Sequence, residues 1–298
     1  MEENKTNINW YPGHMAKTKR QILEDLKLID VIVEVLDARI PISSQNPDIK
    51  EYSKNKKRVV VLNKSDLADE NETNKWIKYF KEKGIPAISV DCNSGKGVNE
   101  VIRAVKEVAK EEQEKFSNKG RVGKSIRIMI LGIPNVGKST FINKITKKKT
   151  AQVGNKPGVT RQKQWVKVDN EIELMDTPGI LWPKFESQEV GMNLAFTGTI
   201  KDDILEKTEI AFELLKFLLN QYNAKVIERY KLEASKVEEI LSNKDSDEND
   251  NYLEILNIIA KKRGAILSGE RIDYEKISGI LLDEFRSGKL GKITIEKK

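Results

Sequence analysis

The stretch ILGIPNVGKST, at Ile130–Thr140, decides the fold of this chain. It contains the pattern G-x-x-x-x-G-K-[ST] and begins inside the apolar run RIMIL, so it predicts a strand, a glycine-rich loop and a helix in that order. Glycines let backbone N–H groups curl around phosphate oxygens without side-chain clashes. The N-terminus of the following helix favours the same anion. The stretch therefore predicts a phosphate-binding loop at the carboxyl end of a strand.

The side chains of this loop indicate a nucleoside triphosphate bound together with magnesium. Lys138 is expected to reach the β- and γ-phosphates, and the Ser139 hydroxyl is expected to ligate the metal ion. Further nucleotide contacts are expected from Asn135, Val136, Gly137 and Thr140. A glycine-rich turn without a ligand is the alternative, and the strand and helix on either side of the loop count against it.

Two later segments supply the switch elements that accompany such a loop. DTPG, at Asp176–Gly179, follows the apolar run EIELM. There Asp176 is expected to hold magnesium through a water molecule, and the Gly179 amide is expected to bond the γ-phosphate. Thr160, in KPGVTR, is the best candidate to bind the metal ion and sense the γ-phosphate. The run of residues 152–160 fits a loop that becomes ordered when the triphosphate binds.

NKSD, which begins at Asn63, follows the apolar run VVVL and predicts the base specificity. The Asp66 carboxylate can accept hydrogen bonds from guanine N1–H and the exocyclic amine, a donor pair that adenine lacks. A buried acceptor rejects the wrong partner by roughly 10⁴-fold. Asn63 is expected to bond the carbonyl edge of the base, and the stem of Lys64 is expected to lie over the ring. SVDCNSGKG supplies a second loop that places Asn93 and Ser94 near the base.

These motifs occur in the reverse of the usual order. An ordinary GTPase runs from the phosphate loop through the switches to the base loops, whereas here the base loops come first. The two orders close to the same site if the old termini are joined and a new break is opened, which proteins tolerate where termini lie close together. The polar residues 111–125 are the expected joint. The chain is therefore predicted to be a circularly permuted GTPase.

Short apolar runs alternate with helical stretches up to about residue 203, and amphipathic helices alone follow. Such alternation predicts an α/β fold, a mainly parallel sheet with helices on both faces, whose ligands bind at the strand carboxyl ends. We expect a GTPase domain with an N-terminal helical extension over residues 1–203. An all-α domain is expected over residues 204–298, with the acidic run KDSDENDN forming a solvated loop.

Composition favours a polyanionic partner and excludes several protein classes. The 298 residues carry a formal net charge of +7, with a pI near 9.1 and a mean hydropathy of −0.53. A basic balance of this size favours nucleic acid or anionic lipid, although ordinary solubility explains it as well. The single cysteine, Cys92, excludes an intrachain disulfide and fits a reducing cytoplasm. Neither a secretory signal nor a membrane-spanning stretch is expected.

Taken together, the motifs resemble the ribosome biogenesis GTPase A family (RbgA/YlqF) of circularly permuted GTPases. The matching strings span nearly the whole chain in the family's order: NWYPGHMAK, VIVEVLDARIP, NKSD, GIPNVGKST, PGVTR, DTPGILWPK and LLDEFRSGKLGKITIE. The resemblance implies a cytoplasmic GTPase that acts late in the maturation of the large (50S) ribosomal subunit. It also implies a helical C-terminal domain that contacts ribosomal RNA.

The residue after DTPG is Ile180, where many GTPases place a glutamine that orients the attacking water. Slow intrinsic hydrolysis is therefore expected, with stimulation by the large subunit. His14, the only histidine, is implicated in catalysis by the resemblance, because a neutral imidazole can orient or deprotonate water; a structural or RNA-contacting role is the alternative. Asn135 is expected to ligate potassium beside the phosphates, as in similar potassium-activated GTPases.

The expected cofactors are thus GTP or GDP, Mg²⁺ and K⁺, and the expected partner is the large-subunit precursor, with its RNA and proteins. Basic runs that begin at Lys17, Lys54, Lys147 and Lys261 could grip RNA phosphates, although solvated surface charge explains any single one. Neither DNA nor a membrane is expected as a partner. Two alternatives stay open: a GTPase with another target, and an RNA-binding chaperone that uses GTP only as a conformational ligand.

Overall fold

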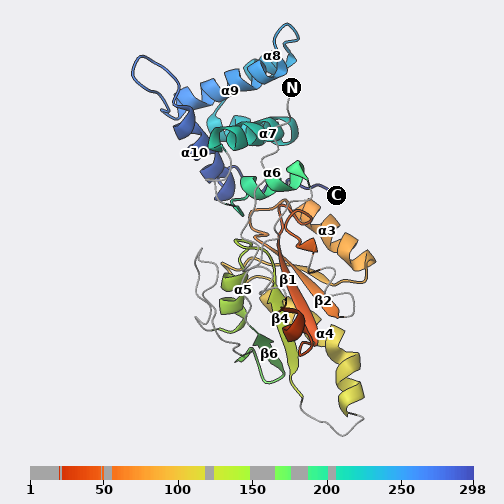
Figure 1. Cartoon of the computed structure of the whole chain (residues 1–298). Coiled ribbons are helices and arrows are strands. Elements are labelled where there is room, and N and C mark those ends of the chain that lie inside the picture. Colours follow the sequence, from red (N-terminus) through yellow and green to blue (C-terminus); the bar gives the residue numbers. More distant parts are fainter. Residues whose placement is uncertain are drawn as a thin grey trace. The chain divides into compact units, whose positions relative to one another are not determined.

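Six strands form a single sheet in the computed structural model, which describes residues 20, 22–47, 49, 56–117, 124–147, 165–175, 187–200 and 206–298. The strands are β1 (Val31–Asp37), β2 (Lys57–Asn63), β3 (Ala87–Ser89), β4 (Ile126–Leu131), β5 (Trp165–Lys167) and β6 (Ile172–Met175). Their order is β3-β2-β1-β4-β6-β5, and every pairing is parallel except that of β5 with β6. The α/β fold is confirmed (Figure 1).

The central strand β1 explains why this sheet needs helices on both faces. All of its residues are buried, which is the pattern of a parallel strand covered on two sides. One face holds Ile32, which packs with helical residues of 22–26, and Leu36, which packs with α3 (Glu70–Glu82). Since side chains alternate along a strand, Val33 and Val35 face the other way. α4 (Val98–Ser117) contacts β1, β2 and β4 and also α5 (Lys138–Ile145).

The expected joint between the two halves of the sheet is partly helical. α4 continues to Ser117, so residues 111–117 belong to the helix instead of to a polar connector. Their sequence, EEQEKFS, is rich in residues with high helix propensity, and that local preference explains the longer helix. The base-loop strand β2 and the phosphate-loop strand β4 nevertheless flank β1 in one continuous sheet. The permuted order along the chain thus closes into one site.

The chain divides into two compact units, one of residues 1–191 and 294–298 and one of residues 192–293. The division lies before the expected boundary at 203/204, and the last five residues return to the first unit. A local contact accounts for the earlier division. The Arg286 guanidinium donates to the carbonyl oxygens of Ala195 and Phe196, and so holds the end of α6 (Gln188–Phe196) within the helical unit.

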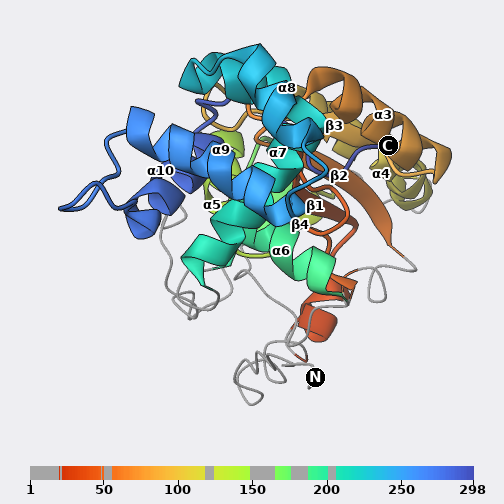
Figure 2. The same cartoon turned by 90° about the horizontal axis from the view of Figure 1, so that it is seen from above.

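The second unit contains α7 (Lys207–Tyr230), α8 (Ala234–Ser242), α9 (Glu248–Lys262) and α10 (Tyr274–Arg286). α7 packs against both α9 and α10 (Figure 2). Non-helical dihedral angles at Tyr222 interrupt α7. Lys231 adopts a left-handed conformation that ends α7 and separates it from α8.

The acidic run beginning at Lys244 is not only a solvated loop, as the sequence suggested. The Asp247 carboxylate accepts a hydrogen bond from the Asn249 backbone N–H at 2.8 Å and caps α9. Glu248 and Asp250 lie in the first turn, where negative side chains favour the helix dipole. Half of the run is therefore a helix start. Across the described parts of the chain, no helix has the length and apolar content needed to cross a lipid bilayer.

Candidate nucleotide-binding site

Three loops meet at the carboxyl edge of the sheet, because their strands are parallel neighbours. In the register of β1 with β2, Asp37 lies opposite Asn63, and NKSD begins at that point. The second base loop follows β3, next to β2. The phosphate loop follows β4, on the other side of β1. The topology thus brings together the segments that the sequence predicted as base and phosphate loops.

Asn63 joins all three loops through one side chain. Its Nδ2 donates to the carbonyl oxygen of Val136, in the phosphate loop, at 2.7 Å. Its Oδ1 accepts from the Cys92 backbone N–H, in the second base loop, at 3.3 Å. Asn63 is almost fully buried. We predicted that it would contact the base, and its observed contacts are those of a residue that holds the base loop and the phosphate loop in register.

The phosphate loop needs glycine at two points of close approach. Gly137 has a φ of 96°, and a Cβ there would lie 2.2 Å from Asn63 Nδ2. A Cβ on Gly132 would lie 2.5 Å from the Val35 carbonyl oxygen. α5 begins at Lys138, whose Nζ donates to the Ile133 carbonyl at 3.2 Å and therefore lies within the curl of the loop. The loop is built around the position that the sequence predicts for the phosphates.

The other predicted residues of this loop lie around Lys138. Ser139 and Thr140 follow it in the first turn of α5, and both are half-buried. Asn135 is exposed and has a φ of 62°, a left-handed conformation that asparagine tolerates better than most residues. Asn135 thus lies in a tight turn at the surface of the loop.

The second base loop is a tight turn held against α5. The Asp91 carboxylate accepts from the Asn93 backbone N–H at 2.8 Å, and Ser94 Oγ accepts from the Lys96 backbone N–H at 3.3 Å. Lys144 donates from Nζ to the Asn93 carbonyl at 2.9 Å. Asn93 and Ser94 are exposed, so both are accessible to a ligand.

Comparison with known proteins identifies the family of this chain. The family model described as 50S ribosome-binding GTPase matches residues 127–258, and the model described as RsgA GTPase matches residues 49–186. Ribosome biogenesis GTPase A of Bacillus cereus is 49% identical over 289 residues, covering 97% of this chain and 93% of the relative. The chain belongs to the ribosome biogenesis GTPase A family.

More distant members of the ribosome biogenesis GTPase A family extend over the same length. The Thermotoga maritima relative of that name is 30% identical, covering 97% of this chain and 94% of its own. A GDP-bound YlqF structure aligns with a TM-score of 0.65 at 26% identity, covering 93% of this chain and 99% of that one. A GNP-bound YlqF from T. maritima aligns with a TM-score of 0.62. The similarity thus includes both the GTPase and the helical parts.

In this family member, sequence reasoning missed the buried charge cluster behind the base loop. Asp37 ends β1, and Arg39 donates to it from Nε at 3.0 Å and from Nη2 at 2.8 Å. Lys64 Nζ lies 3.0 Å from Asp37 Oδ2. Burial alone would raise the pKa of Asp37, but the charges of Arg39 and Lys64 hold it far below its usual range. Lys64 therefore forms an ion pair with Asp37. The sequence predicted only that its stem lies over the base.

A signal for this cluster was present in the sequence. Asp37 and Arg39 end the apolar run VIVEVLDARIP, so the parallel topology places them at the same sheet edge as NKSD. Arg39 is only 1% exposed, and a buried arginine almost always has a carboxylate partner. In the sequence the string indicates only the family, and the structure adds that it carries the Asp37–Arg39 ion pair.

Asp66 and Cys92 have opposite surroundings within the site. Asp66 is exposed, yet partial burial and the nearby Asp91 carboxylate raise its pKa. Cys92 is buried, and burial together with the charges of Asp91 and Asp66 raises the pKa of its thiol to about 12. The thiol therefore stays protonated at neutral pH, so of these two groups Asp66 is the one that can present a charge to a ligand.

The remaining predicted residues lie outside the described residues: His14, Thr160, Asp176, Gly179 and Ile180. Their roles stay predictions. Within the described residues, no cluster of three or more His, Cys, Asp or Glu side chains could hold a metal ion. That result leaves the predicted magnesium ligands untested, because one of them is the hydroxyl of Ser139 and the others are not described.

Proposed function

We propose that this chain is a GTP-hydrolysing assembly factor for the large ribosomal subunit. It binds the precursor particle in the GTP state, late in maturation, and leaves when GTP is hydrolysed. The observation that carries the proposal is the Asn63–Val136 hydrogen bond, which joins a guanine-type loop to a phosphate loop. It occurs in a chain that belongs to the ribosome biogenesis GTPase A family over nearly its full length. The cytoplasm is the compartment that this function implies.

The proposed nucleotide contacts follow from the residue types in the motifs. Asp66 selects guanine, and Lys138 neutralises the β- and γ-phosphates. Ser139 lies beside Lys138 in the first turn of α5, so its hydroxyl fits as an oxygen ligand for Mg²⁺. Thr160 and Asp176 would supply the other magnesium contacts, and the Gly179 amide would bond the γ-phosphate. Bound magnesium supplies charge that polarises the phosphates.

Hydrolysis is proposed to depend on groups beyond the phosphate loop. Ile180 offers no group that can orient water, so intrinsic turnover is slow. His14 is the candidate to orient or deprotonate the water once the particle is bound. Asn135 is the candidate ligand for potassium, which would add positive charge where negative charge develops. An equal rate of hydrolysis in sodium and potassium would contradict the second role.

The charges of the two units indicate how the particle is held. Residues 192–293 contain 16 Lys and Arg against 19 Asp and Glu, a formal charge of −3. Since the whole chain has a formal charge of +7, the first unit carries +10. Electrostatic contact with RNA phosphates is thus better supplied by the GTPase unit. We propose that the helical unit also contacts the particle, through surfaces that do not depend on net positive charge.

The test is GTP hydrolysis in potassium buffer, alone and with purified large or small ribosomal subunits. Strong stimulation by large subunits only is the expected result. No stimulation by either particle would overturn the choice of partner and leave the nucleotide site standing. If large subunits stimulate, His14→Ala should remove the stimulation and leave GTP affinity unchanged. Binding to the particle without any hydrolysis would favour the chaperone that uses GTP only as a ligand.

A further inference from the structure

The last five residues, Thr294–Lys298, contact the segment that follows the base loop. Although residues 192–293 precede them in the chain, they belong to the first unit. The Asp69 backbone N–H donates to Thr294 Oγ1 at 2.9 Å, and Thr294 is fully buried. Asp69 lies three residues after Asp66 and caps α3 with its side chain. Thr294 thus holds the downstream side of NKSD.

The same segment also contacts the loop that follows β1. The backbone N–H groups of Ile295 and Glu296 both donate to the Arg39 carbonyl oxygen, at 2.9 and 3.2 Å. The Glu296 carboxylate accepts from the Ser43 backbone N–H at 2.9 Å, from the Ser43 hydroxyl and from the Ile42 backbone N–H. One carboxylate therefore meets three donors of a single loop, and hydrogen bonds to a charged group are the stronger kind.

Arg39 connects this loop to the upstream side of the base loop. Its guanidinium binds Asp37, and Asp37 Oδ2 lies 3.0 Å from Lys64 Nζ. Lys64 has a φ of 59°, a strained conformation that needs support from its surroundings. The terminal residues therefore hold NKSD from both sides, through Arg39 and through Asp69.

Contacts with α3 fix the end of the segment. Trp76 donates from Nε1 to the Glu296 carbonyl at 2.8 Å. The Lys298 backbone N–H donates to Glu72 Oε2 at 2.9 Å, and its ammonium lies 4.3 Å from the centroid of the Tyr79 ring. Such contacts offset the entropy lost when a chain end is ordered.

We propose that the terminal segment Thr294–Lys298 positions NKSD for guanine, with Thr294 and Glu296 as positioning residues. The inference rests on the proposed binding of GTP and assigns to that site a part of the chain that no nucleotide motif contains. Because Thr294 directly follows the helical unit in the chain, the segment is covalently continuous with that unit and contacts the base-loop region through hydrogen bonds.

The test compares full-length Glu296→Gln and Thr294→Val with the unchanged chain. Either change removes an acceptor that the base-loop region uses. We expect dissociation of fluorescently labelled GDP to become roughly tenfold faster, as for the loss of one hydrogen bond to a charged group. The affinity ratio of GDP to IDP, which lacks the exocyclic amine, should fall, since Asp66 would be misplaced. Glu296→Asp should recover part of that ratio.

Lys292→Gln is the matched control, because Lys292 is exposed and lies just before the segment. Circular dichroism and thermal unfolding without nucleotide establish that each variant folds. A folded Glu296→Gln with an unchanged GDP-to-IDP ratio would overturn the proposal, and so would an equal loss of GDP and IDP affinity. Since no ribosomal particle enters the assay, its result is independent of the proposed partner. If Glu296→Gln fails to fold, Thr294→Val gives the same comparison.

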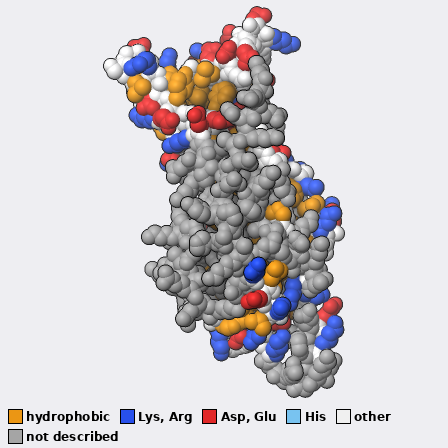
Figure 3. Space-filling view, viewed as in Figure 1, with side chains coloured by type: hydrophobic (Ala, Val, Ile, Leu, Met, Phe, Trp, Pro, Cys, Tyr) orange, Lys and Arg blue, Asp and Glu red, His pale blue; other side chains and the backbone are white. Residues whose placement is uncertain are grey.

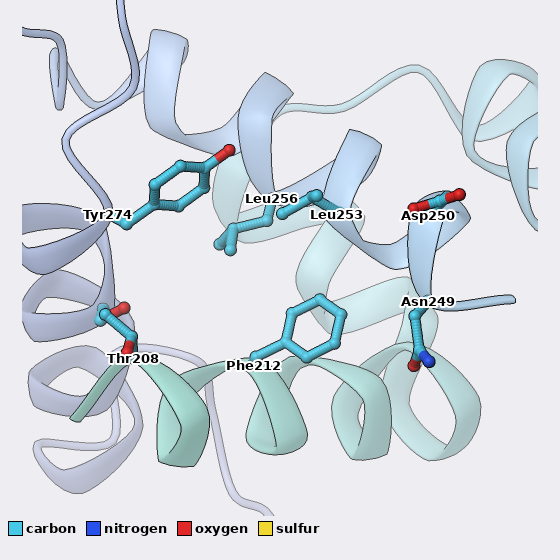
Figure 4. Close-up of a pocket in the computed structure, with 8 residues that line it drawn as sticks. Thr208, Phe212, Asn249, Asp250, Leu253, Leu256 and Tyr274 are labelled. Carbon is cyan, nitrogen blue, oxygen red and sulfur yellow. The ribbon is translucent and has the colours of Figure 1, made fainter. Parts of the chain in front are cut away.

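A second inference rests on a groove that lies wholly within the helical unit. The groove has a volume of about 460 Å³. Its walls come from the N-terminal parts of α7, α9 and α10: Thr208, Phe212, Asn249, Asp250, Leu253, Leu256, Tyr274 and Ser278. Figure 4 shows the Tyr274 and Phe212 rings on opposite sides, with Leu253 and Leu256 between them and Asp250 at one end. Tyr274 is held by a 3.0 Å hydrogen bond from its hydroxyl to Asn257 Oδ1.

Negative charge surrounds this apolar surface. The first turns of the same three helices carry Glu209, Glu248, Asp250 and Glu275. Two nearby cations are already engaged, because Lys216 bonds Glu213 and Asn249 and Lys276 bonds the Gly264 carbonyl. Figure 3 shows hydrophobic side chains of this unit bordered by Asp and Glu, with Lys and Arg among them. We infer that the groove binds a lysine- or arginine-rich protein segment that inserts an apolar side chain. This inference rests on the proposed ribosomal partner.

The test places a photo-crosslinking residue at Tyr274 in the full chain, with the same residue at exposed Glu238 as control. Purified large subunits are added, and the adducts are separated into protein and RNA. We expect a basic ribosomal protein, and Asp250→Lys should reduce the adduct about tenfold. Adducts with RNA or with a second copy of the chain would overturn the role of the groove alone. The absence of any adduct, while the chain still co-sediments with the particle, would do the same. Failure to co-sediment would overturn the ribosomal partner and this inference together.

Discussion

At the scale of single residues, the charge of Asp66 is expected to control guanine binding. Asp66→Asn exchanges an acceptor for a group that also donates, so it should oppose the N1–H and exocyclic amine of guanine. GDP affinity should fall by about 10²-fold or more, and xanthine nucleotides, which present a carbonyl in place of the amine, should bind better than before. Equilibrium titration with labelled GDP and XDP measures both changes. Unchanged selectivity would contradict the role of Asp66.

The same carboxylate predicts a pH dependence. Burial and the Asp91 charge raise the pKa of Asp66, so the free protein protonates it at a higher pH than an ordinary aspartate. Guanine needs the ionised form as acceptor. GDP affinity should therefore be full above the raised pKa and decline as the pH falls through it. Affinity measured from pH 7 downward tests this, and Asp91→Asn should move the decline to lower pH.

Asn63 predicts a different outcome, because it contacts protein groups in this structure. Asn63→Asp keeps the size of the side chain and removes the Nδ2–H donor to Val136, leaving a carbonyl beside a buried charge. A loss of about 1–3 kcal/mol in the free energy of unfolding is expected, together with weaker binding of GDP. Chemical denaturation and GDP titration measure the two effects. Loss of binding with unchanged stability would show that Asn63 acts on the ligand alone.

These residues mark what a sequence can and cannot predict about the site. The motif residues Asn63 and Gly137 were predictable, because the chemistry of phosphate and base binding demands particular residue types at particular spacings. The Asn63–Val136 bond and the Asp37–Lys64 contact were not, since each depends on which strands become neighbours. A motif predicts which residues contact the ligand, whereas the tertiary structure determines which other residues position them.

At the scale of elements, strands were predicted more reliably than helix ends. The buried runs of a parallel sheet are continuous and apolar, so their signal is strong. Helix ends depend on caps and local propensity, and there the predictions failed. α4 extends into a segment that looked like a connector, and Asp247 turns half of an acidic run into the start of α9. In both places the charged residues favour a helix and not a solvated loop.

The cap of α9 gives a testable consequence. Asp247→Ala removes the acceptor of the Asn249 N–H bond and should destabilise the helix start by about 1 kcal/mol. Hydrogen exchange at the first amides of α9 should then be roughly fivefold faster, while exchange in β1 stays unchanged. Asp245→Ala, which removes a carboxylate of the same run before the helix, is the control. Equal effects of both changes would show that net charge, and not capping, is responsible.

At the scale of the whole molecule, the permuted order changes what lies at each end of the GTPase unit. The joint follows α4 and the helical unit follows the switch region, while the terminal segment returns to α3 and the base loop. None of this return was visible in the sequence, where KITIE resembles any short tail. Its partners are separated from it by more than 200 residues, and only the folded chain brings them together.

The unequal charge of the two units predicts how binding to the particle responds to salt. The first unit carries +10 and the helical unit −3, so cations of the first unit should release most of the counterions. Replacing Lys147, Lys148 and Lys149 by Gln should lower the slope of log affinity against log salt by about 2–3, at roughly 0.7–0.9 per phosphate contact. Co-sedimentation with large subunits over a KCl series, with a non-hydrolysable GTP analogue, measures the slope. Replacing Lys231, Lys236 and Lys244 removes equal charge from the helical unit and should change the slope little; the reverse order would show that the helical unit, despite its negative charge, holds the RNA.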